Sequence, residues 1–127
     1  MIFVDTSFLI ALLIKTDSYH EKALKIAESI HERKVINNTV LNETLNAFTG
    51  KGGKLGKELY NIIGEMFDIQ FLNQADYENA MEIYLHLDSS INYSDCTILS
   101  TMLQNKINKI ISFDSDFEKI KGITRIN

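Results

Sequence analysis

The sequence predicts an α/β fold with a mainly parallel central sheet of about five strands, flanked by helices. Short apolar segments alternate with segments of helical periodicity along the whole length, and parallel strands require helical crossovers of this kind. The chain has 127 residues, of which 45% are hydrophobic and 24% charged. This size and composition predict a single globular domain, residues 1–127.

The first part of the chain predicts a strand, two helices and a second strand. The sequence MIFV at 1–4 forms a buried strand, and apolar residues at helical spacing predict a helix over 6–15. Ser18 is a suitable cap for a helix reaching about Arg33. The inward side chains of that helix are Ala23, Leu24, Ala27 and Ile30. KVINN at 34–38 is the second strand.

The rest of the chain continues the alternation. A helix over 39–49 ends at the glycines of GKGGKLGK, residues 50–57, which predict a flexible basic loop. Ser94 is a plausible cap for a later helix. The remaining elements are a helix to about Met66, a strand at 68–72, a helix at 75–87, a loop at 88–93, a helix at 94–105, a strand at 109–112, a turn with a short helix at 114–120, and a strand at 122–126.

Composition excludes several classes of protein. No apolar run approaches the roughly 18 residues of a membrane span, and the apolar N-terminal segment lacks a basic leader. The single cysteine excludes an internal disulfide and thiolate-bound zinc. The three histidines show no metal-ligand spacing. A cytoplasmic location is therefore expected.

Two carboxylates follow strands that the fold class places near each other. Asp5 comes at the end of the first strand and Asp114 at the end of 109–112, and the functional crevice of such sheets lies at the carboxyl ends of strands. Glu43 shares a helix face with Val40 and Ala47, where burying a carboxylate is costly. Asp95 lies in the first turn of its helix, which favours its charge.

Each acid also has a simpler interpretation. Asp5 could cap the following helix, Asp95 could be an ordinary first-turn residue, and Asp114 with Asp116 could form a turn. Glu43 could lie at a rim. A single carboxylate metal site explains all these positions together, because Mg²⁺ and Mn²⁺ prefer oxygen ligands.

The net charge of −4 argues against broad attraction to nucleic acid. Without the five acids of the predicted site, however, 17 acids become 12 (17 − 5), against 13 basic residues. Lys51, Lys54 and Lys57 could then contact phosphates, although a solvated loop is an equally good interpretation.

Four motifs resemble those of the PIN-domain ribonucleases, and within them the VapC toxins of toxin–antitoxin pairs. They are FVDTSFLIAL, VLNETLNAF, YSDCTILS and IISFDSDFEKI, in this order along the chain. Each is weak alone, but the four together cover essentially the whole chain.

This resemblance implies a Mg²⁺- or Mn²⁺-dependent endoribonuclease that forms a homodimer and is blocked by an antitoxin. It implies that Asp5, Glu43, Asp95 and Asp114 form the metal cluster. Asp116 is then either a water-mediated ligand or a helix cap. Ser7 and Ser112 could hydrogen-bond carboxylates or a phosphate. Cys96 stands where a small residue is common, and we interpret it as buried.

The main alternative is a PIN-like RNA-binding or regulatory module with weak catalysis. A receiver domain would need paired acids after the first strand and a late Lys-Pro, but Asp5 stands alone and proline is absent. A phosphatase of the haloacid-dehalogenase type would carry its aspartate pair early. An EF-hand would need Gly and Glu where Lys119 and Arg125 stand. The glycine-rich segment does not match a P-loop.

Overall fold

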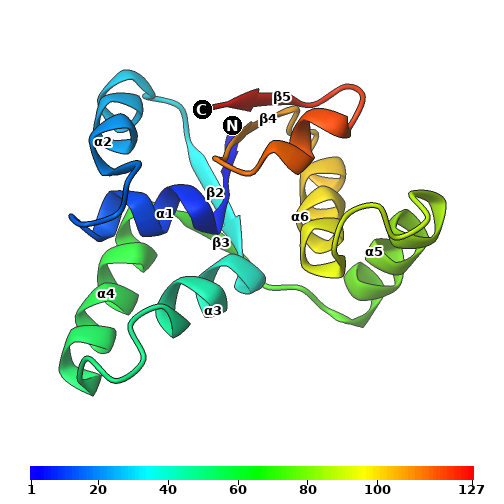
Figure 1. Ribbon diagram of the computed structural model, residues 1–127. Coiled ribbons are helices and arrows are strands. Elements are labelled where there is room, and N and C mark those ends of the chain that lie inside the picture. The colour runs from blue at the N-terminus through cyan, green and yellow to red at the C-terminus, as the bar shows by residue number, and fades with distance from the viewer.

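The structure is a computed structural model that describes residues 1–127, and its centre is a five-stranded parallel sheet (Figure 1). The strand order is β3-β2-β1-β4-β5, and every pairing is parallel. The predicted fold class is confirmed. The strands are β1 (Ile2–Val4), β2 (Lys34–Asn37), β3 (Asp68–Gln70), β4 (Lys109–Ile111) and β5 (Thr124–Ile126).

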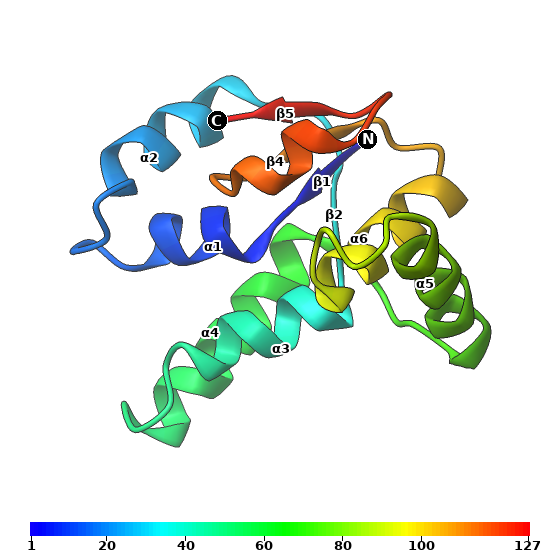
Figure 2. The same cartoon turned by 45° about the vertical axis from the view of Figure 1, so that its right-hand side comes forward.

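Helices cover both sides of this sheet. In Figures 1 and 2, α1 and α2 lie on one side and α5 and α6 on the other, while α3 and α4 project together as an arm. The helices are α1 (Thr6–Leu13), α2 (His20–Ser29), α3 (Asn38–Asn46), α4 (Gly53–Met66), α5 (Gln74–His86), α6 (Tyr93–Gln104) and the short 3₁₀ helix η1 (Ser115–Lys119).

The core is built around the central strand β1 and the helix α6. All three residues of β1 are fully buried, and so is Ile110 of the neighbouring β4. In α6 the eight consecutive residues from Asp95 to Met102 are buried. A helix buried on all sides is fixed firmly in place, so the acid in its first turn has a well-defined position.

Two predicted helix caps are wrong. The helix α2 begins at His20 after Tyr19, without a side-chain cap, and ends at Ser29. Asp17, not Ser18, accepts a hydrogen bond from the Tyr19 amide at this turn (2.8 Å). Asn92, not Ser94, caps α6. In both places the sequence offers two suitable oxygen acceptors, and only the backbone path selects between them.

The prediction of a flexible loop over residues 50–57 is also wrong for its second half. The helix α4 begins at Gly53 and contains Lys54, Gly56 and Lys57. Leu59 and Ile63 are four residues apart and buried on one face, and their packing outweighs the roughly 1 kcal/mol that a glycine costs in a helix. Leu24 was expected to face inward but is 38% exposed. None of the helices has the length and apolar character of a membrane span.

Candidate functional site

Asp5 and Asp114 lie at the same edge of the sheet because their strands are neighbours. β1 pairs with β4, with Val4 opposite Ile111, and the Asp5 amide donates a hydrogen bond to the Ile111 carbonyl (3.0 Å). Parallel strands bring their carboxyl ends together. The predicted convergence of these two acids therefore follows directly from the topology.

Two serine hydroxyls join these acids. Ser112 Oγ donates to Asp5 Oδ2 at 2.7 Å, and Ser7 Oγ donates to the same oxygen at 3.0 Å. Ser112 Oγ also accepts a bond from the Asp114 amide (3.0 Å). Asp5 stands at the N-cap position of α1, but its side chain makes no capping bond. Its carboxylate is held in the site instead.

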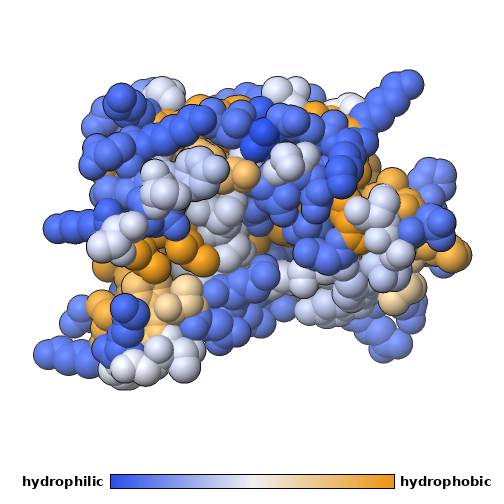
Figure 3. Space-filling view, viewed as in Figure 1, coloured by the Kyte–Doolittle hydropathy of each residue, from blue (hydrophilic) through white to orange (hydrophobic).

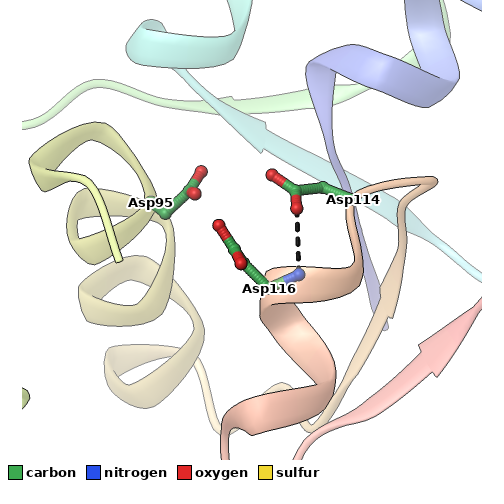
Figure 4. A group of neighbouring side chains, drawn as sticks. All are labelled: Asp95, Asp114 and Asp116. Carbon is green, nitrogen blue, oxygen red and sulfur yellow. Dashed lines mark hydrogen bonds between the residues drawn. The ribbon is translucent and has the colours of Figure 1, made fainter. Parts of the chain in front are cut away.

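Asp95, Asp114 and Asp116 form the tightest group of acids (Figure 4). One carboxylate oxygen from each residue lies within 4.8 Å of those from the others. Asp95 comes from the first turn of α6, and the other two flank the start of η1. Asp114 accepts the Asp116 amide (2.9 Å). Asp114 is thus the cap of η1, and the interpretation of Asp116 as that cap is wrong.

The group carries strong mutual repulsion. Burial, together with the charges of Asp5 and Asp114, raises the pKa of Asp95 to about 7. Burial also raises the pKa of Asp5, although the bonds from Ser112 and Ser7 oppose this change. Asp95 Oδ2 is buried and has no hydrogen-bond partner. A buried carboxylate oxygen without a partner, among like charges, is what a bound cation would stabilise.

Glu43 lies beside this group rather than within it. Its side chain is exposed, and its Oε1 accepts a hydrogen bond from Thr6 Oγ1 (3.1 Å). Partial desolvation and the charge of Asp5 raise its pKa. The buried face of α3 is formed by Val40, Leu41 and Thr44, so Glu43 is not part of it. Glu43 faces the site from its rim.

The family of the chain follows from a comparison with family models. Residues 2–123 match the model described as "PIN domain". The chain belongs to the PIN-domain family. Comparison with curated protein sequences gives no significant match.

Solved structures of bacterial toxins share the architecture of this PIN domain. Mycobacterium tuberculosis VapC20, described as a sarcin–ricin loop cleaving toxin, is 25% identical over 94% of each chain, with a TM-score of 0.82. A toxin–antitoxin complex from Klebsiella pneumoniae is 18% identical, covers 98% of this chain and 96% of its own, and has a TM-score of 0.77. VapBC2 from Rickettsia felis, bound to promoter DNA, is 16% identical, covers 100% of this chain and 98% of its own, and has a TM-score of 0.74.

The three lysines considered as phosphate contacts lie away from the acids of the PIN domain. Lys51, Lys54 and Lys57 are exposed on the loop and first turns that end the α3–α4 arm, away from η1 in Figures 1 and 2. Sequence reasoning instead missed Lys119, whose Nζ lies 2.8 Å from Asp116 Oδ1. Lys119 follows Asp116 by three residues, and this spacing on a helical turn could have predicted the ion pair. Cys96 is fully buried, as expected.

A large pocket of the PIN domain is separate from the acids. It has a volume of about 940 Å³, and none of the five predicted metal ligands lines it. Apolar side chains of α5 and α6, with residues near η1 and β5, form most of its wall, including Leu99, Met102 and Ile123. Asp5 and Asp114 lie instead at the carboxyl ends of β1 and β4.

Proposed function

We propose that this PIN domain, a single nuclease domain over residues 1–127, is a metal-dependent endoribonuclease and the toxin of a toxin–antitoxin pair. The observation that supports this most directly is the group formed by Asp95, Asp114 and Asp116, with Asp95 Oδ2 buried and unpaired. The family and the likeness to a sarcin–ricin loop cleaving toxin support RNA as substrate.

The proposed metal ligands are the acids of this edge. Asp95 and Asp114 would hold Mg²⁺ or Mn²⁺, together with Asp5 and Asp116. When bound, such an ion lowers the pKa of a water molecule and stabilises charge on phosphate oxygens. Partial burial raises the pKa of Glu43, which is exposed at the rim, and its carboxylate would orient an attacking water or accept a proton from it. Lys51, Lys54 and Lys57 are proposed contacts to distant phosphates.

The serines have a positioning role in this proposal. Ser7 and Ser112 both donate to Asp5 Oδ2 and so hold this carboxylate in one orientation. Ser112 additionally fixes the backbone of Asp114. One hydroxyl thus sets the separation of two ligands, which matters because catalytic groups must be held within a fraction of an ångström.

The first test is cleavage by the purified chain with and without Mn²⁺. Total RNA is incubated with the wild type, with Asp5→Asn and with Asp88→Asn, and new 5′ ends are mapped. Asp88 is an exposed acid outside the group, so its variant receives the same chemical change without loss of a ligand. We expect Mn²⁺-dependent cuts from the wild type and Asp88→Asn, and none from Asp5→Asn with an unchanged circular dichroism spectrum. Full activity of Asp5→Asn would refute the assignment.

The proposed partners are a second copy of the chain and a small antitoxin. Figure 3 shows hydrophobic residues gathered over the α5–α6 region and between α1 and α4. The exposed apolar side chains include Met81 (49%), Leu85 (72%) and Leu103 (68%) on α5 and α6, and such patches are typical of interaction surfaces. Light scattering of the purified chain tests the dimer. Co-expression with a neighbouring small gene tests whether a partner suppresses cleavage in the cytoplasm.

A further inference from the structure

A stacked pair of aromatic rings lies beside the acids and has no part in the mechanism above. The rings of Tyr19 and Phe113 are nearly parallel, with centroids 4.6 Å apart and planes at 12°. Phe113 also contacts the buried Phe8, at a centroid distance of 6.1 Å. Tyr19 is 48% exposed. The outer ring of this stack therefore remains open to solvent while the inner ring is anchored in the core.

The stack is connected to the metal site by hydrogen bonds. Phe113 directly precedes Asp114 in the chain, and its amide donates to Ser7 Oγ (3.0 Å). The same hydroxyl donates to Asp5 Oδ2. In Figures 1 and 2 the turn between β4 and η1, which carries Phe113, lies beside α1. The position of the stack is thus fixed relative to the acids by Ser7.

Hydrogen bonds also order the backbone of the turn that carries the exposed ring of Tyr19. The Tyr19 amide donates to Asp17 Oδ1 (2.8 Å), and the Tyr19 carbonyl accepts the bond from the Ala23 amide (2.8 Å). His20 Nδ1 lies 2.7 Å from the carbonyl oxygen of Ala11. These bonds order the turn between α1 and α2 before any ligand arrives. A preordered aromatic surface loses little entropy on binding.

We propose that Tyr19 is a stacking surface for an unpaired nucleobase of the RNA, next to the phosphate at the acidic group. This inference rests on the proposed function and adds a binding residue to it. Single-stranded RNA binds proteins by stacking bases on aromatic rings, which changes affinity by roughly 5- to 150-fold per base. Stacking is needed here because a net charge of −4 gives the chain little electrostatic attraction for RNA.

The chain contains no tryptophan, which provides a direct binding test. Tyr19→Trp keeps an aromatic ring at the stack and introduces the only tryptophan fluorophore. Tyr60→Trp is the matched control, because Tyr60 is 52% exposed on α4 and takes part in none of the aromatic stacks. Each variant is titrated with an oligoadenylate and with an abasic ribose-phosphate oligomer of equal length. Ca²⁺ is present so that the carboxylates do not repel the phosphates.

We expect the oligoadenylate to quench the fluorescence of Tyr19→Trp, and the abasic oligomer and the control variant to show no quenching. Absence of quenching in Tyr19→Trp, or equal quenching in Tyr60→Trp, would overturn the proposal. This readout does not require cleavage. It therefore distinguishes failure of the stacking surface from failure of the proposed nuclease activity.

Kinetics supply the second readout. Tyr19→Leu should raise KM for a cleaved RNA at least about fivefold with little change in kcat, while Tyr19→Phe, which keeps the ring, should match the wild type. An unchanged KM in Tyr19→Leu would overturn the proposal. A decrease in kcat alone would do so too, because it would indicate a distorted site and not lost binding of a base. Circular dichroism spectra establish that each variant is folded.

Discussion

Removing the charge of Asp95 should stabilise the metal-free protein. In the folded chain, burial and neighbouring carboxylates raise the pKa of this group from 3.8 to about 7. The folded state therefore binds more protons than the unfolded chain between about pH 4 and pH 7. Because of this excess, the free energy of unfolding falls as the pH rises through that window. Asn at this position carries no charge and has nearly the same shape.

The expected size follows from that pKa. A change from 3.8 to about 7 corresponds to about 4 kcal/mol, at about 1.4 kcal/mol for each tenfold change in proton affinity. Solvent at the open edge of the site screens part of the repulsion, so we expect about 2 kcal/mol. Asp95 Oδ2 makes no hydrogen bond. Asp95→Asn therefore removes no stabilising bond at this oxygen when it removes the repulsion.

The assay is urea denaturation in EDTA between pH 4 and pH 8, at one protein concentration. The free energy of unfolding of the wild type should decrease by about 2 kcal/mol across this range. In Asp95→Asn most of this pH dependence should be absent. Glu65→Gln, at an exposed position on α4, is the control and should follow the wild type. Mn²⁺ should stabilise the wild type but not Asp95→Asn. Identical pH profiles for wild type and Asp95→Asn would refute the reasoning.

Three further substitutions test the surroundings of the acids. Ser112→Ala removes the bond to Asp5 Oδ2 and should lower the free energy of unfolding by about 2 kcal/mol in urea; a change below about 0.5 kcal/mol would contradict this role. Lys119→Gln removes the cation beside Asp116. It should tighten Mn²⁺ binding about threefold by calorimetry, and weaker binding would contradict the assignment of Asp116 as a ligand. Phe117→Ala opens a cavity under η1, where Phe117 is fully buried, and should cost about 3–5 kcal/mol by the same urea measurement.

The part of the site that could be predicted from sequence is the part that sheet geometry determines. Asp5 and Asp114 each follow a short apolar segment, and the parallel arrangement alone places them together. Asp95 could be placed in a first helical turn by the periodicity of the residues after it. For these acids, local pattern and global topology agree.

The rest could not be predicted because it depends on choices between chemically equivalent groups. Asn92 and Ser94 are both good caps, and the backbone selects Asn92. The position of Glu43 depended on which face of α3 is buried, and the face includes Leu41 and Thr44 rather than Glu43. The helix α4 begins earlier than its glycines predict, because the burial of Leu59 and Ile63 on one face stabilises it. Long-range pairs such as Tyr19 with Phe113 leave no pattern in a single sequence.

The pairing of β1 with β4 has a consequence for synthesis of the protein. Ser112 and Asp5, which share the 2.7 Å hydrogen bond, are 107 positions apart, and β4 lies between β1 and the final strand β5. A chain still growing on the ribosome contains Asp5 and Glu43 long before it contains Asp114. The complete acidic group can therefore form only after Asp116 has been synthesised, and chains that end before this residue lack the proposed activity.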